Sequence, residues 1–340
     1  MNKLETVKKI LDKNNLKNYN QNVFGQAFAP SNIALIKYWG KSNTALNIPN
    51  TDSLSIGLKT LGSDTKISIY QGDQDLVIVN DIIIDLDSEF YMRIKNYLDL
   101  FREYKLNNNQ PFNYYYKLEI KINIPIASGL ASSACGFAAL VLAFDNLFNL
   151  NLTKQELSIL ARLGSGSASR SLWDGFVYWQ KGKDLNGMDS FAYPISTSMP
   201  DLCIGLLILS TQKKSIGSTQ AMLNTCNTSV LYNQAWKAQV EQDMKLMQQA
   251  LAAQDLDLLG ETAENNALAM HATMLAAKPA ILYSNQDTID AMHKVWELRK
   301  QAIKVYFTQD AGPNLKLIFD NKDRQKIQNI FANVQIIQPF

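Results

Sequence analysis

Two lysines and two aromatic rings lie within five consecutive residues, Lys37 to Lys41, of the segment APSNIALIKYWGKSN. A buried strand normally excludes cations, because moving an unpaired charge out of water costs a large free energy. A solvated loop, in turn, gains nothing from exposing two large rings. The pattern therefore fits neither a plain core strand nor a plain loop, and distant segments of the chain bear on what it does.

Residues 125–134, PIASGLASSA, follow a strand-like segment and open a strongly apolar one. Small residues let a backbone turn tightly and approach a ligand closely. The first turn of a helix then presents unpaired N–H groups and the positive end of the helix dipole, which together bind anions. Ser128, Ser132 and Ser133 add hydroxyl donors. Because glycine and serine also serve as helix caps, a phosphate-binding loop and a plain helix start fit this segment equally well.

Two further segments place charged side chains among small residues. Residues 164–171, GSGSASRS, contain Arg170, whose guanidinium fork suits a carboxylate or a phosphate. The alternative is a surface arginine in a flexible connection, but a helix and a buried strand are expected close on either side. Residues 307–314, FTQDAGPN, place Asp310 in a turn at the end of a strand. Aspartate is common in turns, and acid–base chemistry would need an acidic proton within its reach.

Motifs of several other enzyme classes are absent. The WGKS of residues 39–42 is not a Walker A loop, because Leu35 stands where that motif needs glycine. Neither GxGxxG nor GxSxG occurs, which argues against a dinucleotide site and a serine-hydrolase elbow. His271 and His293 lack metal-ligand spacing and are expected to be structural. Ser218 precedes a helical pattern and could either donate to a phosphate or cap the helix.

The composition is that of an ordinary globular protein of 340 residues, 46% hydrophobic and 19% charged. This length suggests about two domains. A net charge of +2 argues against a surface that coats nucleic acid. Cys135, Cys203 and Cys226 have no CxxC spacing and an odd count, which favours free thiols in a reducing compartment. The chain shows no secretory signal and no apolar stretch of the roughly 20 residues that a membrane span needs. A cytoplasmic protein without membrane or nucleic-acid partners is expected.

Hydrophobic periodicity predicts the elements that position these segments. Strands are expected at residues 65–71, 75–80, 117–124, 175–182 and 203–209, and on both sides of the Asp310 turn within 304–320. Helices are expected at residues 89–105, 129–148, 154–164, 229–253, 255–277, 286–304 and 323–334. Thr153 and Glu156 form a capping-box signature at the start of the third helix. Two α+β domains, residues 23–189 and 190–340, are predicted to follow an N-terminal extension, residues 1–22.

Taken together, NIALIKYWGK, GLASSA, GSGSASRS, HAT and FT-x-DAGPN resemble the diphosphomevalonate decarboxylases of the GHMP kinase superfamily, from about residue 25 to residue 337. GLASSA alone identifies only the superfamily, whereas NIALIKYWGK with GSGSASRS and DAGPN is far more specific. The resemblance implies a GHMP kinase-like α+β fold of two domains. The N-terminal domain would contain a left-handed βαβ crossover, an exception to the usual hand, and the C-terminal domain would be ferredoxin-like. The active site would lie between them, and family members are commonly homodimers.

The reaction that the resemblance implies accounts for the lysines and rings. These enzymes use ATP and Mg2+ to phosphorylate the C3 hydroxyl of mevalonate 5-diphosphate, then eliminate phosphate and CO2 to give isopentenyl diphosphate. Every intermediate is rich in negative charge, so cations must lie beside the reacting centre, while rings restrict water and shape the pocket. Phosphoryl transfer depends mostly on positioning and charge stabilisation, which such a site can supply.

The resemblance also implies catalytic roles for five residues. Lys37 is expected near the C3 oxygen and Asp310, and Asp310 is expected to accept or orient the C3 hydroxyl proton. Arg170 would grip the departing carboxylate with two prongs, assisted by Ser167 and Asn32. Such a grip would fix the carboxylate in the geometry for C–C cleavage.

Further residues are implied in binding. The diphosphate end of the substrate is assigned to Tyr38, Trp39 and Lys41, and other substrate contacts are assigned to Ser165 and Ala311. The residues assigned to the phosphates of ATP, with Mg2+, are Ser128, Gly129, Leu130, Ala131, Ser132 and Ser133, with Ser218 on the other side. No protein ligand of the metal is predicted.

Three substitutions depart from the family pattern. Ile120 replaces a serine before the nucleotide loop, Asp174 replaces a glycine after the arginine segment, and Gln309 replaces a Phe or Met before the catalytic aspartate. Nucleotide preference and efficiency are therefore left open. The alternatives are an enzyme that phosphorylates C3 without decarboxylation, a decarboxylase of the monophosphate, and a ligand-binding pseudoenzyme. The lysine–aromatic segment favours the diphosphate, and the complete catalytic set argues against a pseudoenzyme.

Overall fold

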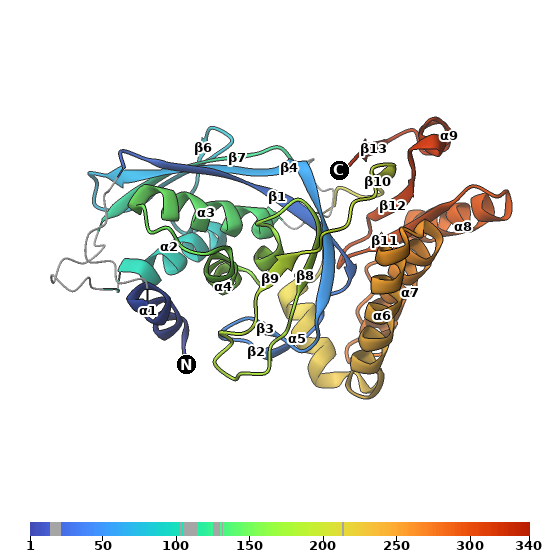
Figure 1. The fold of residues 1–340 in the computed structure, drawn as a ribbon, viewed down its shortest axis with the longest axis horizontal. Helices are drawn as coiled ribbons and strands as arrows, with labels where there is room; N and C mark the ends of the chain where they lie inside the picture. The colour runs from blue at the N-terminus through green and yellow to red at the C-terminus, as the bar shows by residue number, and fades with distance from the viewer. Residues whose placement is uncertain (14–21, 103, 105–113, 125–129, 131, 213) are drawn as a thin grey trace.

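The computed structural model describes residues 1–13, 22–102, 104, 114–124, 130, 132–212 and 214–340. Ser128, Gly129 and Ala131 of the predicted ATP loop lie outside the described residues. The chain forms two α+β parts side by side. The N-terminal part is layered, and the C-terminal part contains the longest helix, residues 256–275 (Figure 1).

The N-terminal part is built on a seven-stranded sheet with the order β6-β5-β7-β4-β8-β9, and β1 also pairs with β4. Its strands are β1 (Gly25–Ile36), β4 (Ser53–Tyr70), β5 (Leu76–Val79), β6 (Ile82–Ile83), β7 (Tyr115–Ile122), β8 (Gly175–Trp179) and β9 (Ala192–Pro194). β5 and β7 run parallel, and β6 and the helix α2 (Glu89–Arg102) lie between them in the chain. The left-handed crossover stays a prediction. A separate hairpin consists of β2 (Lys41–Asn43) and β3 (Ile48–Pro49).

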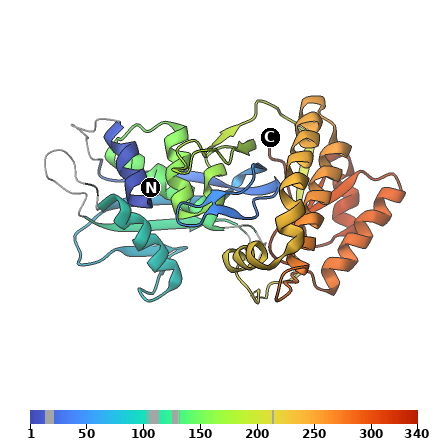
Figure 2. The ribbon, with the colours of Figure 1, turned by 90° about the horizontal axis from the view of Figure 1, so that it is seen from below.

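Helices α1 (Lys3–Lys13), α2, α3 (Ser132–Phe148) and α4 (Lys154–Gly164) lie on one face of this sheet (Figures 1 and 2). α3 is apolar around most of its surface because it packs against β1 and β4 and against α4. The capping box at the start of α4 is confirmed, since Thr153 and Glu156 exchange their hydrogen bonds. α1 belongs to the fold, because Val7, Ile10 and Leu11 are fully buried in the same core.

The C-terminal part contains an antiparallel sheet with the order β11-β12-β10-β13. Its strands are β10 (Leu202–Leu207), β11 (Val305–Gln309), β12 (Leu315–Asp320) and β13 (Val334–Ile337). The first and third strands along the chain are central, as in a ferredoxin-like fold, which confirms that prediction. The predicted helix over residues 323–334 is too long: α9 (Arg324–Ile330) ends early because Val334–Ile337 pairs with β10 as an edge strand.

The remaining helices of the C-terminal part connect β10 to β11. They are α5 (Ser218–Thr228), a π-helical turn η2 (Tyr232–Trp236), α6 (Lys237–Ala253), α7 (Leu256–Leu275) and α8 (Gln286–Lys300). Two 3-10 turns, η1 (Gly166–Arg170) and η3 (Asn321–Asp323), complete the described elements. None of the helices that the structure describes is long and apolar enough to cross a membrane.

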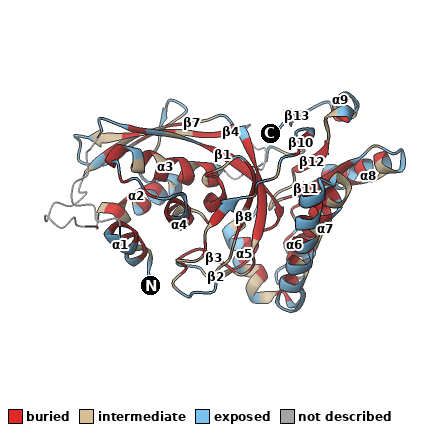
Figure 3. Cartoon of the chain, viewed as in Figure 1, coloured by how far each residue is buried: buried red, intermediate tan, exposed pale blue. Residues whose placement is uncertain are grey.

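A shared hydrophobic core joins the two parts. Ile33, Leu35 and Ile36 of β1 are fully buried with side chains of α6 and α7 such as Met247 and Met274. Figure 3 shows the buried residues of β1 and β4 where these strands approach α6 and α7, while the outer faces of these helices are exposed. The residues that end β1 are therefore held by both parts at once. The domain limit at residue 189 stays a prediction, and β9 adds its pairing with β8 just beyond it.

Candidate active site

Asp310 lies in the turn after β11 with a lysine at each of its carboxylate oxygens. Lys37 Nζ is 2.7 Å from Oδ1, and Lys316 Nζ is 3.1 Å from Oδ2. Both lysines are almost fully buried, at 2% and 1% exposure, whereas the Asp310 side chain is 30% exposed. Lys37 also donates to the carbonyl oxygen of Ala34 over 2.9 Å. The carboxylate thus joins the end of β1 to the C-terminal sheet and keeps one side open to a ligand.

The charges of this cluster set its protonation. Burial alone would raise the pKa of Asp310, but the two lysines outweigh burial and hold that pKa well below its usual range. Burial lowers the pKa of Lys37, and Asp310 offsets part of that shift. The carboxylate is therefore ionised throughout the physiological pH range and is a weak base.

His271 of α7 supports the same turn. Its Nε2 lies 3.2 Å from the carbonyl oxygen of Asp310, which can only accept, so Nε2 carries the proton. Burial, with a further contribution from Lys37, lowers the pKa of His271 to about 4. The ring is neutral and holds the backbone of Asp310 in place, which agrees with the structural role predicted for this residue.

Gln309, one of the departures from the family pattern, braces the turn from inside. Its side chain donates to the carbonyl oxygen of Gly312 over 2.8 Å and to Ser284 over 3.1 Å. It is 1% exposed. Gln309 therefore helps to fix the position of Asp310 rather than facing a ligand.

Lys37 is positioned through its backbone by two helices. Its N–H donates to Oδ1 of Asn266 in α7 over 2.8 Å, and Asn266 in turn donates to Asp243 of α6, also over 2.8 Å. All three residues are buried. Periodicity predicted these helices but not this contact. Its signal in the sequence was the polar pair of Asn266 and Asp243 on otherwise apolar faces of α7 and α6.

Arg170, at the end of η1, is 2% exposed and lies between β1 and β4. It donates to Ser53 over 2.5 Å and reaches Oδ1 of Asn32 over 3.3 and 3.4 Å. Asn32 itself donates to Ser171 over 2.7 Å and to the carbonyl oxygen of Ser167 over 3.3 Å. The predicted group of Arg170, Asn32 and Ser167 is therefore assembled in one place. Ser53 was missed, because an alternating strand does not reveal which of its serines faces an arginine.

Electrostatics links Arg170 to the lysine–aspartate cluster. Burial lowers the pKa of Arg170 to about 10, and the charge of Asp310 counteracts this shift. The charge of Arg170, in turn, contributes to the lowered pKa of Lys37. Lys37, Arg170 and Asp310, from three distant segments, thus belong to one region of charge.

Tyr38 follows Lys37 and presents a buried hydroxyl that has no hydrogen-bond partner among the described residues. Its ring packs against Trp179 with centroids 4.8 Å apart. A Cβ on Gly166 would lie 2.5 Å from this hydroxyl, so the GSGSASRS turn approaches the tyrosine closely enough to require glycine. Trp39 lies in the shared core, and its carbonyl oxygen accepts from Trp236 and Tyr232. Contact between Trp39 and a ligand stays a prediction.

Lys41 lies in a second cationic group. Its Nζ donates to Asn47 over 2.7 Å. Burial lowers the pKa of Lys41, and the charges of Lys3 and Arg93 lower it further. Lys3 of α1 and Arg93 of α2 were not predicted as site residues, because both read as polar positions of amphipathic helices.

A row of serines joins the predicted ATP loop to the GSGSASRS turn. Ser133 Oγ is 3.3 Å from Ser165 Oγ, which is 3.4 Å from Ser167 Oγ. Ser132 opens α3, whose first turn contains no acidic residue. Leu130 packs, partly buried, against the shared core. The two segments with hydroxyl donors therefore lie side by side.

Lys214 connects Ser218 to the FTQDAGPN segment. It donates to Ser218 over 2.9 Å and to the carbonyl oxygen of Ala311 over 2.8 Å. Ser218 is the first residue of α5 and does not cap it, because Gly217 occupies the N-cap position. Ser218 and Ala311 are thus brought together by a lysine that the sequence reading did not single out.

The other two departures do not face the cluster. Ile120 is 4% exposed and packs in the N-terminal core. Asp174 is exposed as a residue. Partial burial of its carboxyl group raises its pKa, and the charge of Lys59 offsets part of this shift. Neither is in contact with Arg170 or Asp310 in any hydrogen bond or ion pair between described residues. 

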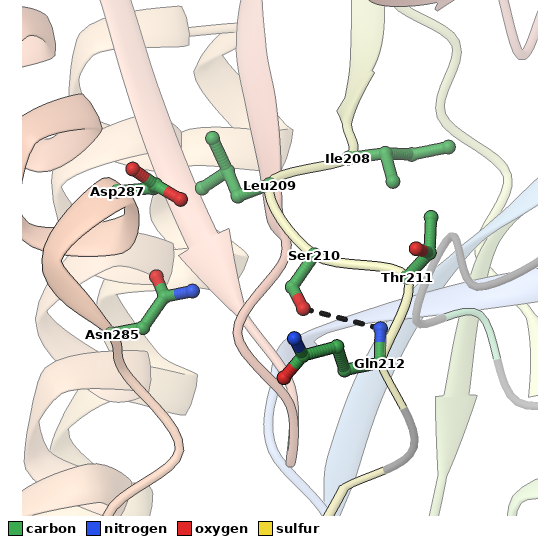
Figure 4. Close-up of a pocket in the computed structure, with 7 residues that line it drawn as sticks. All are labelled: Ile208, Leu209, Ser210, Thr211, Gln212, Asn285 and Asp287. Carbon is green, nitrogen blue, oxygen red and sulfur yellow. Dashed lines mark hydrogen bonds between the residues drawn. The ribbon is translucent and has the colours of Figure 1, made fainter.

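A pocket lies at the end of β10 beside the start of α8 (Figure 4). Its lining residues are Ile208, Leu209, Ser210, Thr211, Gln212, Asn285 and Asp287. None of them was predicted as a site residue. Among the described residues that line it, Asp287 is the one carboxylate and none is a lysine or an arginine.

Comparison with known proteins identifies the family to which this chain belongs. Residues 29–192 match the family described as "Diphosphomevalonate decarboxylase-like N-terminal domain", and residues 204–338 match "Mevalonate 5-diphosphate decarboxylase C-terminal domain". The chain belongs to the diphosphomevalonate decarboxylase family. The diphosphomevalonate decarboxylase of Saccharomyces cerevisiae is 35% identical over 316 residues, 88% of this chain and 78% of that protein. That of Debaryomyces hansenii is 32% identical over 315 residues, 89% of this chain and 81% of that protein.

Solved structures of diphosphomevalonate decarboxylases share the fold. The mevalonate diphosphate decarboxylase from Staphylococcus aureus is 34% identical with a TM-score of 0.86, covering 93% of this chain and 96% of that one. MDDEF in complex with MVAPP, AMPPCP and magnesium is 34% identical with a TM-score of 0.83, covering 92% and 96%. The GHMP kinase-like two-domain fold is therefore confirmed.

Proposed function

We propose that the chain catalyses the ATP-dependent decarboxylation of mevalonate 5-diphosphate to isopentenyl diphosphate, with release of ADP, phosphate and CO2. The observation that carries this proposal is one half-open carboxylate, Asp310, between two buried lysines and in electrostatic reach of Arg170. The solved relative in complex with MVAPP, AMPPCP and magnesium supports both substrates and the metal.

Asp310 and Lys37 serve the first half of the reaction. Asp310 accepts a hydrogen bond from the C3 hydroxyl of the substrate. This bond orients the hydroxyl oxygen toward the γ-phosphoryl group. Its low pKa favours orienting this hydroxyl over removing its proton outright. Lys37 supplies positive charge where negative charge develops on the C3 oxygen.

Arg170 serves the second half. Held by Ser53 and Asn32, its guanidinium group binds the carboxylate that departs as CO2 and keeps the breaking C–C bond aligned with the leaving phosphate. Ser167, next in the same turn, assists. The cation holds the carboxylate in place until the bond breaks.

The remaining groups bind the diphosphate end of the substrate. The buried Tyr38 hydroxyl has no partner among the described residues and can donate to a phosphate oxygen. Lys41 adds a cation whose neighbours are cationic as well, so an anion there relieves their repulsion. We assign Ser165 to the same end and Trp39 to the closed wall behind it.

ATP and Mg2+ fit the hydroxyl-rich side of the site. Ser132 and Ser133, on a helix start without acidic residues, and Ser218 beside Lys214 would hold the phosphates. Among the described residues, no three His, Cys, Asp or Glu side chains gather closely enough to hold a metal ion. Mg2+ commonly binds mainly through phosphates and water, and here it would neutralise phosphate charge.

Parallel measurement of ADP and CO2 tests this function. With mevalonate 5-diphosphate, equal amounts of both products are expected, and mevalonate and its monophosphate should give little of either. ADP without CO2 would instead indicate a C3 kinase, and activity confined to the monophosphate would indicate a decarboxylase of that substrate.

We also propose that the chain acts as a homodimer in the cytoplasm. Exposed apolar side chains lie just after α5 and at and after the end of α7; they are Val230, Leu231, Leu275 and Leu282. Hydrogen bonds of Asn224 to Pro279 and of Lys278 to Thr228 connect the two segments. The three cysteines are free thiols, as a reducing compartment allows. Light scattering should give twice the chain mass of 38.2 kDa.

A further inference from the structure

Lys316 is a buried cation for which the sequence offered no role. It lies in β12 between Leu315 and Leu317, which are fully buried, and is itself 1% exposed. Alternate residues of a strand face opposite sides of the sheet. Leu315 and Leu317 pack in the core beside α8, whereas Ile318, the next residue on the other side, packs in the core shared by the two parts. Lys316 therefore points from the C-terminal sheet toward the active site.

Stability does not account for a lysine at this position. Taking an ammonium group out of water costs so much free energy that well-packed apolar residues often replace buried ion pairs without loss. A leucine or methionine would continue the apolar pattern of β12. Because Lys316 Nζ lies 3.1 Å from Oδ2 of Asp310, its position points to a role at that carboxylate.

The two lysines pair with different oxygens of the Asp310 carboxylate. Lys37 approaches Oδ1 from the end of β1, and Lys316 approaches Oδ2 from β12. Each carboxylate oxygen has two lone-pair directions, so each can still accept one further hydrogen bond. With both oxygens held from different elements, the carboxylate cannot turn about its Cβ–Cγ bond without breaking an ion pair.

Other charges surround the same group. Burial lowers the pKa of Arg170 and of Lys214, and the charge of Asp310 raises both, so both lie within its field. His271 contributes a neutral ring at the Asp310 backbone. Among the described residues, only Lys37 and Lys316 form ion pairs with the Asp310 carboxylate, so these two lysines fix its orientation, whereas Arg170 and Lys214 act on it through their charge.

We propose that Lys316 is a positioning residue for phosphoryl transfer, an inference that rests on the proposed function. It holds Oδ2 of Asp310 so that Oδ1 stays between Lys37 and the C3 hydroxyl. In this step the C3 oxygen bonds to the γ-phosphorus while the bond from that phosphorus to ADP breaks. The hydroxyl proton ends on an oxygen of the transferred phosphoryl group, because a carboxylate held by two lysines does not keep it.

Lys316→Met and Lys316→Gln test this role, with Lys322→Met, at an exposed lysine just after the same strand, as the matched control. The Met variant should lower kcat about 10- to 100-fold, the effect of losing one hydrogen bond to a charged group. KM for both substrates should change less than about threefold, since Lys316 does not touch them. Glutamine keeps a donor and should recover part of the loss. Wild-type kcat, or a loss confined to KM, would overturn the proposal.

A double-mutant cycle separates positioning from damage to the fold. If Lys316 acts through Asp310, then Lys316→Met added to Asp310→Asn should lower kcat by less than about threefold. A further loss as large as in the wild-type background would show an independent role and overturn the proposal. If the Met variant does not fold, the Gln variant supports the same cycle. A wild-type protein that releases no CO2 refutes the proposed function itself, which is a different outcome.

Discussion

Replacing Arg170 with lysine tests the grip on the departing carboxylate, because the charge is kept while the fork is lost. The guanidinium group spans Ser53 and Asn32 with separate nitrogens, over 2.5 and 3.3 Å, and is 2% exposed. A single ammonium nitrogen cannot hold both residues and a substrate carboxylate in the same geometry. Losing one hydrogen bond to a charged group costs about 1.5–3 kcal/mol, and about 1.4 kcal/mol corresponds to a tenfold change in rate. We therefore expect kcat/KM to fall about 10- to 100-fold.

The assay is CO2 release from mevalonate 5-diphosphate at saturating ATP, with ADP measured in parallel. Arg299→Lys is a matched control, because Arg299 is paired with Glu264 and makes no hydrogen bond or ion pair with Lys37, Arg170 or Asp310 among the described residues. This variant should leave the kinetics unchanged. Thermal unfolding of both variants checks that the fold is intact. An Arg170→Lys variant with the wild-type kcat/KM would refute the two-pronged grip.

Three further predictions concern the aspartate, the histidine and the metal. Asp310→Asn should lower kcat about 100- to 10,000-fold, because the variant loses the charged acceptor that orients the C3 hydroxyl for transfer, with little change in substrate binding by calorimetry; near-normal turnover would contradict its role. The pKa of His271, lowered to about 4, lies below its unfolded value of about 6.5, so this residue contributes stability that is complete above pH 6.5 and is lost as the pH falls toward 4. The imidazole resonances of His271 should be constant from pH 5.5 to 8, whereas a midpoint between pH 6 and 7 would show that the ring is not desolvated. Chelation of Mg2+ should abolish ADP release, and undiminished release without divalent metal would exclude the proposed nucleotide site.

Local patterns were sufficient for most elements. The apolar spacing within α2 and α4, the capping box at Thr153 and the uniformly apolar α3 each depend on neighbours within one or two turns. The end of α9 did not follow, because residues 331–334 continue a helical pattern while pairing with β10 ends the helix. Long-range pairing overrides local propensity there.

Some residues of the candidate site were predictable from local motifs, and others were visible only through long-range packing. Motifs in three segments predicted Lys37, Arg170 and Asp310, because unusual residue types stand out within a short stretch. Lys316 did not stand out, since a single lysine near the start of a mostly apolar strand is typical of a solvent-facing position. Only the packing of the two parts against each other shows that this face is covered. Asn266 of α7, which holds the backbone of Lys37, was not identified either, because its contact with Lys37 is long-range and depends on the packing of α7 against β1.

A crystal structure of the chain with mevalonate 5-diphosphate and a non-hydrolysable ATP analogue tests the central claim most directly. The account predicts that one bound substrate molecule places its carboxylate against Arg170 and its C3 hydroxyl within hydrogen-bond distance of Asp310, beside Lys37. A substrate that contacts only one of these three side chains, or a carboxylate turned away from Arg170, would contradict it.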